Sequence, residues 1–284
     1  MSQQRLFVML ACLTSCAHAQ WLNYIPSGTP RLADGKPNLA APAPRGLDGH
    51  PDLSGVWMHE TTTVEEVKRL FGHRYDDDIA ASIPGMEIGT QHKYWFDILV
   101  DFQPNEDAMI RPEGAAIRRQ RMAQRDPTRV CTGLPSGFTN NNWVSEPIKI
   151  IQSPQVTVIL YEAGNLHRQI FTDGRTLPKE FELPAFNGYT AGHWEKDTLV
   201  AETAGFNDRT ALDRDGHFHS DALRVTERFR RRDFGNLDIE MTFDDPKTYT
   251  RPFTINVPHH LIADNDIFEM YCENEKDQVH LKKD

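Results

Sequence analysis

The sequence lacks the short motifs that identify several large enzyme classes. It contains no Gly-x-Ser-x-Gly, no phosphate-binding P-loop, no glycine-rich dinucleotide turn, no His-Glu-x-x-His and no Cys-x-x-Cys. These absences argue against a serine hydrolase, a nucleotide-dependent enzyme, a zincin and a thiol oxidoreductase.

Positive charge is also scarce. Lysine and arginine total 31 against 41 acidic residues, a formal net charge of −10 at pH 7. Nonspecific binding to nucleic acid or to an anionic membrane needs a basic surface, so the composition argues against both partners. One basic run, Arg228 to Arg232, lies between Glu227 and Asp233 and fits either a solvated strand face or an anion site.

No apolar run is long enough to cross a bilayer, which takes about 20 residues. The run Leu6–Leu13 follows a single arginine and is followed by Ala17-His18-Ala19, the pattern of a cleaved export signal. We therefore expect residues 1–19 to be a signal peptide and the protein to be periplasmic or secreted. Leu13-Thr14-Ser15-Cys16 also fits a lipobox, so a lipid anchor at Cys16 on the outer membrane is the alternative.

Cysteine is rare, with four in the chain, two of them in the expected leader. In an oxidising compartment the other two, Cys131 and Cys272, predict one disulfide. It would close a loop of about 140 residues and stabilise the fold by roughly 4 to 5 kcal/mol. Two unpaired structural thiols are the alternative.

After the leader, the sequence predicts three parts. Residues 20–54 read as a proline-rich extended arm in which Pro30–Leu39 recurs as Pro44–Leu53, each copy with an Asp-Gly turn. Residues 55–145 read as a mixed α/β segment that packs on the barrel. Within it we expect helices over 63–71 and 113–124 and a strand over 94–102.

Residues 146–284 read as an antiparallel β-barrel-like domain. Apolar residues alternate with polar ones, and short turns separate the runs, including 189–194 with 198–203 and 223–229 with 237–243. A last hairpin is expected between 253–257 and 267–272. The fold class is therefore mainly β, a meander that closes into a lipocalin-like barrel because closure removes exposed strand edges.

Several motifs resemble a large family of secreted bacterial proteins. They are Ile170-Phe171-Thr172-Asp173-Gly174-Arg175-x-Leu177-Pro178, Trp194-Glu195-x-Asp197-Thr198-Leu199-Val200-x-Glu202-Thr203, Gly205-Phe206-Asn207-Asp208, Gly216-His217-x-His219-Ser220, Val225-Thr226-Glu227-Arg228-Phe229-Arg230-Arg231 and Cys272-x-Asn274-Glu275. The resemblance covers nearly all of the chain after the leader. The resemblance implies export and a shared architecture, and it does not indicate an activity.

The strongest candidate site follows the Gly-Phe-Asn-Asp motif. Two histidines at i and i+2 on an extended segment, His217 and His219, point the same way, and with Asp208 and Arg209 they predict acid–base chemistry. Both histidines are also candidate ligands of a divalent metal ion. A plain turn, whose Asp and His side chains cap backbone groups, is the alternative.

A second set of candidates lies on the predicted strands. Tyr161, His167 and Arg168 lie on neighbouring strands and are candidate substrate-binding residues, of which we expect one to point into the barrel. A buried Arg168 needs an acid such as Glu202 or Glu227, and such a pair fits a structural latch and a site equally well. Glu202 is also a candidate substrate-binding residue, either buried or facing solvent. His259-His260 is expected to be a surface pair.

These residues favour an exported enzyme that performs metal-free or metal-assisted acid–base chemistry, of lyase, isomerase or hydrolase type, on a small organic substrate at the barrel mouth. A lipocalin-like carrier of an apolar or aromatic ligand is the first alternative, and a structural envelope protein is the second.

Overall fold

A computed structural model describes residues 28–72, 92–123, 147–162, 166–213 and 215–268. The expected signal peptide, Cys16, and the predicted Cys131–Cys272 disulfide lie outside these residues. No helix within the described ranges is both long and apolar enough to cross a bilayer.

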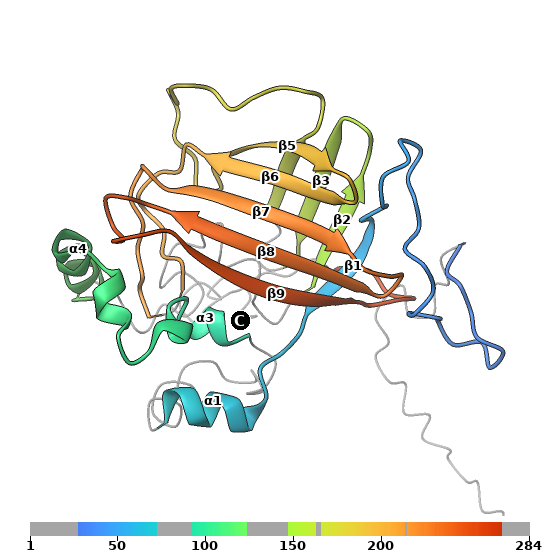
Figure 1. Ribbon diagram of the computed structural model, residues 1–284, viewed down its shortest axis with the longest axis horizontal. Coiled ribbons are helices and arrows are strands. Elements are labelled where there is room, and N and C mark those ends of the chain that lie inside the picture. Colours follow the sequence, from blue (N-terminus) through green and yellow to red (C-terminus); the bar gives the residue numbers. More distant parts are fainter. Residues whose placement is uncertain (1–27, 73–91, 124–146, 163–165, 214, 269–284) are drawn as a thin grey trace, which may run out of the picture.

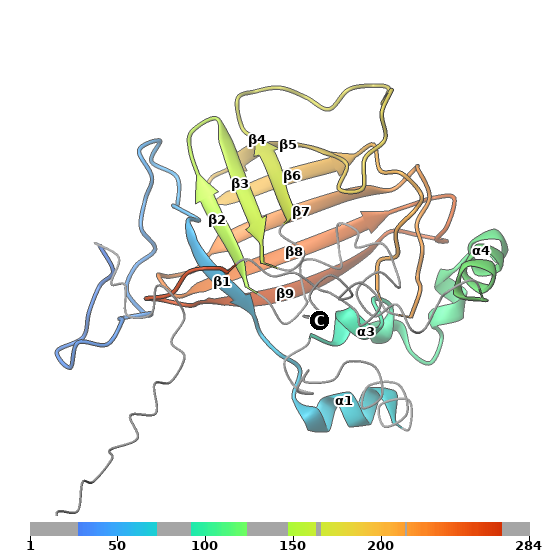
Figure 2. The ribbon, with the colours of Figure 1, turned by 180° about the vertical axis from the view of Figure 1, so that it is seen from behind.

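Nine strands form a closed barrel in chain order, with the last strand paired to the first, which confirms the predicted fold class (Figure 1). The strands are β1 Gly55–His59, β2 Ile148–Gln152, β3 Val156–Tyr161, β4 Leu166–Phe171, β5 Tyr189–Glu195, β6 Thr198–Ala204, β7 Arg224–Arg231, β8 Asn236–Asp244 and β9 Phe253–Leu261. Strands β1 to β4 form the side of the barrel seen in Figure 2.

Alternating residues of each strand fill the barrel. On β8 the side chains of Leu237, Ile239, Met241 and Phe243 are buried and their neighbours are more exposed, which is the period of two that the sequence shows. Removal of this apolar surface from water is the main force that closes the barrel.

Two strand predictions were wrong in detail. Strands β4 and β5 pair in parallel, over only two residue pairs, because the chain between them crosses over instead of turning back. The last hairpin, expected over 253–257 and 267–272, does not form in its described part. Residues 262–268 are irregular, and β9 pairs with β1 and not with a tenth strand.

The helices are α1 Val64–Phe71, α3 Lys93–Phe96 and α4 Pro112–Ala123, with 3-10 turns η1 Val100–Phe102 and η2 Glu106–Met109. Helices α1 and α4 lie where the sequence predicts them, and the Thr63 hydroxyl caps α1 by accepting from the Glu66 amide at 3.2 Å. The predicted strand over 94–102 was wrong, since α3 and η1 occupy these residues.

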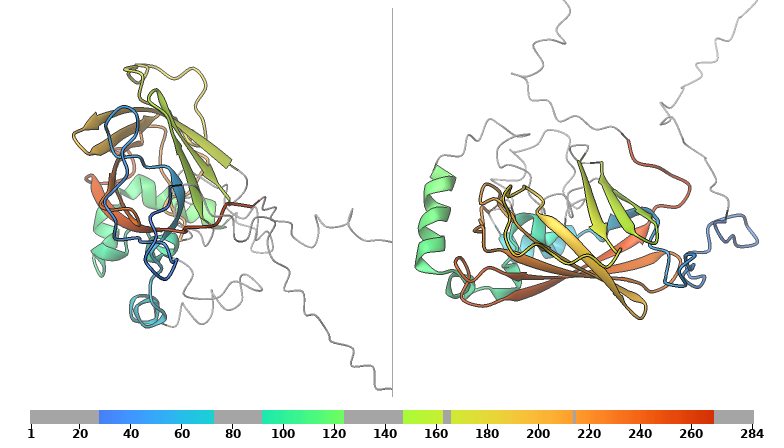
Figure 3. Two further views of the ribbon diagram at one scale, coloured as in Figure 1. Left: turned by 90° about the vertical axis from the view of Figure 1, so that its right-hand side faces the viewer. Right: turned by 90° about the horizontal axis from the view of Figure 1, so that it is seen from above.

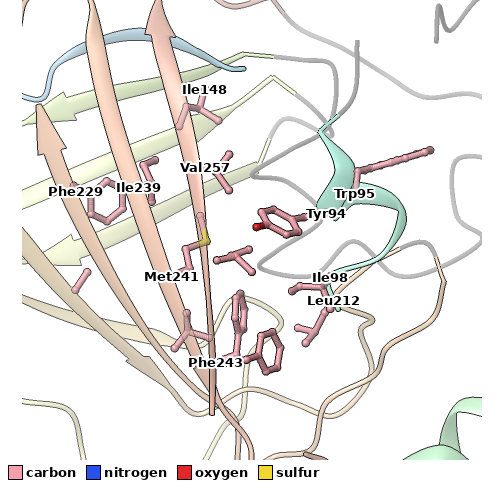
Figure 4. Packing of buried hydrophobic residues seen from close by; sticks show 14 of the residues in the cluster. Tyr94, Trp95, Ile98, Ile148, Leu212, Phe229, Ile239, Met241, Phe243 and Val257 are labelled. Carbon is pink, nitrogen blue, oxygen red and sulfur yellow. The ribbon is translucent and has the colours of Figure 1, made fainter. Parts of the chain in front are cut away.

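Helix α3 and η1 lie along the part of β9 that has no strand partner on the β1 side (Figure 1). Figure 4 shows Tyr94 pointing toward Met241 and Val257, with Ile98 next to Leu212. Phe102 meets Phe253 edge to face, with 6.2 Å between ring centroids. The aromatic run 94–96 therefore has the composition of a strand but forms a short helix, in which Tyr94 faces the barrel and Phe96 packs on Phe71 of α1, with 5.3 Å between ring centroids.

The two copies of the arm repeat have the same structure and dock at different places. In each copy the Asp-Gly glycine has a positive φ, and the arginine donates to its carbonyl, as Arg45 does to Gly49 at 2.8 Å. Arg31 then forms an ion pair with Asp264, and Arg45 with Asp197 in the β5–β6 turn. The arm lies at the end of the barrel opposite α4 (Figure 3).

Candidate functional site

The loop from Gly205 to Ser220 carries the main candidate residues. It leaves β6 at the end of the barrel where the β8–β9 loop and α4 also lie. The Asn207 side chain accepts from the Arg209 amide at 3.1 Å, and Ala211 bridges to Phe218, so the loop folds back on itself. Residues far apart in the loop are thereby brought together.

A cleft of about 550 Å³ lies between this loop and α4. Its walls are formed by Gly114, Ile117, Arg121, Pro184, Phe186, Phe206, Asn207, Asp208, Arg209, Phe218, His219, Ser220, Asp221 and Thr248. Ile117 and Phe186 are 41% and 46% exposed, so they give the rim of the cleft some apolar surface. A cleft of this size suits a small organic molecule.

His219 forms part of the cleft wall and is almost fully buried. Its Nδ1 lies 3.0 Å from the Ser220 carbonyl oxygen and its Nε2 lies 2.6 Å from the Thr210 hydroxyl. A carbonyl oxygen only accepts, so Nδ1 carries the proton and Nε2 accepts from Thr210. Burial lowers the pKa of His219, although the Ser220 carbonyl and Asp245 partly oppose this, so the ring is neutral and basic at Nε2.

Charged side chains surround the cleft. Arg121 from α4 lies 3.3 Å from the carboxylate of Asp208 and 4.8 Å from the ring centroid of Phe218. Arg209 is exposed, and its guanidinium forms no hydrogen bond or ion pair with the residues that the structure describes. Three of the four predicted catalytic residues, His219, Asp208 and Arg209, therefore meet at one cleft.

The fourth, His217, does not face the cleft. Its Nδ1 lies 2.5 Å from Asp213 Oδ2 and 3.7 Å from Asp97 Oδ1, and all three side chains are 0% exposed. The prediction that His217 and His219 point the same way was wrong, because the segment is a folded loop and not a strand. A metal ion held by both histidines is not supported by this geometry.

Asp97 and Asp213 join two distant parts of the chain. Asp213 accepts from the amides of Ile98 at 2.7 Å and His217 at 3.0 Å. Burial and the charge of Asp213 raise the pKa of Asp97 to about 7. Burial opposes a charge on His217, but Asp213 outweighs it and raises the pKa of His217.

The four predicted substrate-binding residues on the strands do not lie together. His167 and Arg168 line a second pocket, of about 410 Å³, between β4, the crossover after it and the start of β5. Tyr161 is buried near Arg168, and burial raises its pKa to about 12. Glu202 is exposed on the outer face of β6, because its neighbours Ala201 and Thr203 point inward, so it lies in neither pocket.

Arg168 is neutralised by the other predicted acid, Glu227. The pair is buried and bidentate, with Nη1 to Oε1 at 3.0 Å, and Arg168 Nη2 also donates to the Thr203 hydroxyl at 3.1 Å. Because it joins β4 to β7, the pair fixes the barrel from inside, which is the structural one of the two roles that the sequence left open.

Sequence reasoning missed two features. Asp97 follows an aromatic run and belongs to no motif, so nothing linked it to His217. His259 was expected at the surface, but it is buried beside His59, with 6.3 Å between ring centroids, and His92 lies 6.1 Å from His59. Burial, followed by the charge of His59, lowers the pKa of both His92 and His259 to about 3.

Comparison with protein-family models, curated proteins and solved structures gives no match. The chemistry that the protein can perform is therefore inferred from its own side chains.

One group of buried side chains could hold a metal ion. In the described part of the chain, the ligand atoms of Asp97, Asp213 and His217 all lie within 4.8 Å of one another.

Proposed function

We propose that the protein is an exported enzyme that binds a small organic anion with an apolar or aromatic body in the 550 Å³ cleft and performs acid–base chemistry on it with His219. The observation that carries the proposal is a buried, neutral histidine in the wall of a cleft that also presents Arg209, which has no ion-pair partner among the described residues. Export rests on the leader sequence and on the resemblance to secreted proteins.

The cleft offers separate contacts for the two parts of such a ligand. Phe186, Phe206 and Phe218 provide apolar contact for its body. Arg209 provides a cation without an acid that already neutralises it, whereas Arg121 is paired with Asp208. An anionic group therefore binds best on the Arg209 side of the cleft.

His219 acts as the general base in this proposal. Its Nδ1–H is fixed by Ser220, which leaves the Nε2 lone pair for a proton. Nε2 now accepts from Thr210, so a ligand that replaces this hydroxyl meets a basic nitrogen. Removal of a proton from carbon next to a carbonyl is the simplest step that this arrangement can support.

The second candidate function is carriage of the same ligand without chemistry. It is favoured by one observation, that both ring nitrogens of His219 already have hydrogen-bond partners within the protein. A carrier needs the apolar walls and Arg209 but no free base.

Binding of matched ligands tests the proposal. We expect phenylacetate to raise the melting temperature and to bind more tightly than phenylacetamide, which has the same body and no charge. Arg209→Ala should weaken phenylacetate binding about tenfold, equivalent to about 1.4 kcal/mol, and leave phenylacetamide unchanged. Equal binding of both ligands to the wild type and to Arg209→Ala contradicts the proposal.

Deuterium exchange separates enzyme from carrier. Phenylpyruvate has acidic carbon-bound protons, and we expect the protein to catalyse their exchange with D2O, measured by NMR. His219→Ala should slow the exchange by about a hundredfold or more while binding is retained. Binding without catalysed exchange, in both proteins, supports the carrier.

A further inference from the structure

The buried cluster behind the cleft contains more acid than its partners neutralise. Asp97 and Asp213 are both 0% exposed, and among the described residues only His217 forms an ion pair with them. Glu106, in η2, brings a third carboxyl within hydrogen-bonding reach of Asp97. Buried charges are normally paired or bound to metal ions, because removing them from water is costly.

Two buried polar atoms of residues in this cluster are unsatisfied in the described part of the chain. His217 Nε2 and Glu106 Oε2 are buried, and neither has a hydrogen-bond partner in the described part of the chain. Most buried polar side-chain atoms in proteins do have one. Glu106 Oε2 is an acceptor in a residue that approaches Asp97, so it has a lone pair to offer to a bound cation.

The geometry is that of a metal site before the ion binds. The ligand atoms of Asp97, Asp213 and His217 lie within 4.8 Å of one another. Bonds of about 2.0 to 2.2 Å from a zinc ion hold nitrogen and oxygen ligands roughly 3 Å or more apart. The 3.7 Å between His217 Nδ1 and Asp97 Oδ1 suits this, and the 2.5 Å to Asp213 must lengthen by about half an ångström.

We infer that Asp97, Asp213 and His217, with Glu106 as a fourth ligand, form a structural site for a divalent transition-metal ion. One imidazole among carboxylates favours Zn²⁺ or Mn²⁺ over Mg²⁺ or Ca²⁺, which bind oxygen ligands. The ion replaces the proton that His217 and Asp213 now share. It fastens residues 97–106 to the loop that carries His219, and none of the four residues lines the cleft.

A structural and not a catalytic role follows from the burial of the site. Catalytic metal sites keep an open position for water or substrate, whereas structural sites are closed by protein ligands. The site therefore stabilises the cleft loop, and its occupancy is measured by metal content and stability and not by turnover.

Metal analysis of the whole protein tests the inference. The protein is stripped with EDTA, dialysed, and titrated with ZnCl2 or MnCl2, with MgCl2 in parallel. We expect one equivalent of Zn²⁺ or Mn²⁺ by ICP-MS and a rise in melting temperature of roughly 5 to 10 °C near saturation, with no rise for Mg²⁺. No stoichiometric metal and no rise with either ion overturns the inference.

Substitutions show whether the ion lies at this cluster. Asp97→Asn and Asp213→Asn should lose the bound equivalent, and Glu106→Gln should weaken binding about tenfold, equivalent to about 1.4 kcal/mol. Asp107→Asn, which removes an exposed carboxylate next to Glu106, is the matched control and should bind as the wild type does. Equal binding by all four variants assigns the metal to exposed histidines and overturns the inference.

Two further measurements keep the test decisive. If the aspartate variants do not fold, Glu106→Gln and the wild-type titration decide, because Glu106 is only partly buried. The Co²⁺-substituted protein should show visible absorption bands that His217→Gln changes. Arg209→Ala, which tests the proposed ligand site, should keep its full metal content, so the two proposals can fail separately.

Discussion

His217 and His219 are two residues apart and equally buried, yet their environments shift their pKa values in opposite directions. Asp213 raises the pKa of His217, whereas burial, without a carboxylate in contact, lowers the pKa of His219. Burial sets the cost of charge at both positions, and the nearest acid decides whether the ring is charged.

The difference assigns the two histidines to different tasks. The ring with the raised pKa is sealed with Asp213 and Asp97 and connects two segments, which is a structural role. The neutral ring forms part of the cleft wall and keeps a basic nitrogen, which is what chemistry requires. The Gly-His-x-His-Ser motif therefore contains one structural and one candidate catalytic histidine.

The largest expected loss of stability comes from removing Asp213, the carboxylate that raises the pKa of His217. Asp213→Ala removes the partner of His217 and leaves the Ile98 amide without its acceptor, so we expect a loss of about 3 to 5 kcal/mol in the free energy of unfolding. His219→Ala removes only neutral hydrogen bonds and should cost about 1 to 3 kcal/mol. Urea unfolding in the presence of EDTA measures both, and equal losses contradict the comparison.

A pH profile extends the comparison to His259, which is buried like His219 and has a pKa of about 3. The folded pKa lies below the unfolded value of 6.5, so the unfolded state binds more protons below pH 6.5. The stability contributed by the neutral ring is complete above pH 6.5 and is lost as the pH falls toward 3. His217, with a raised pKa, has the opposite sign and contributes most below pH 6.5.

We therefore expect wild-type stability to fall by about 1.4 kcal/mol per pH unit more steeply than that of His259→Gln between pH 6 and pH 4. The measurement is urea unfolding at closely spaced pH values. The adjacent exposed residue provides the control, because His260→Gln should keep the wild-type slope. Parallel profiles for wild type and His259→Gln would exclude a buried, neutral His259.

The smallest effect is expected at Asp208, the exposed carboxylate of the same loop. Its side chain is 61% exposed and pairs with Arg121 at 3.3 Å. Exposed ion pairs contribute about 0 to 1 kcal/mol, so Asp208→Ala should change the free energy of unfolding by less than about 1 kcal/mol. A loss as large as that of Asp213→Ala would show that exposure does not separate the two acids.

Much of the fold could be predicted from the sequence, because the alternation of buried and exposed residues along a strand depends only on neighbouring residues. The run on β8 places apolar side chains at every second position, β7 alternates buried with less buried residues, and β3 is rich in β-branched and aromatic residues; each of these runs forms a strand. The cap of α1 and the proline that begins α4 are also local signals.

The failures occurred where distant contacts decide the structure. Tyr94, Trp95 and Phe96 have strand-like composition, but they form a short helix, because Tyr94 packs on the barrel and Phe96 packs on Phe71 of α1. The second partner of β9 is β1, at least 200 residues earlier in the chain, so no turn signal could show this pairing.

The sequence by itself determined the period of the strands, the two arm turns and the presence of His219, Asp208 and Arg209 in one loop. Only the tertiary structure decided which histidine has the raised pKa, because the folded loop places Asp213 against His217 and not against His219, and α3 brings Asp97 to the same ring from a segment more than 100 residues away. Local spacing fixes which way a side chain points along a strand, whereas its pKa depends on whatever the fold places beside it.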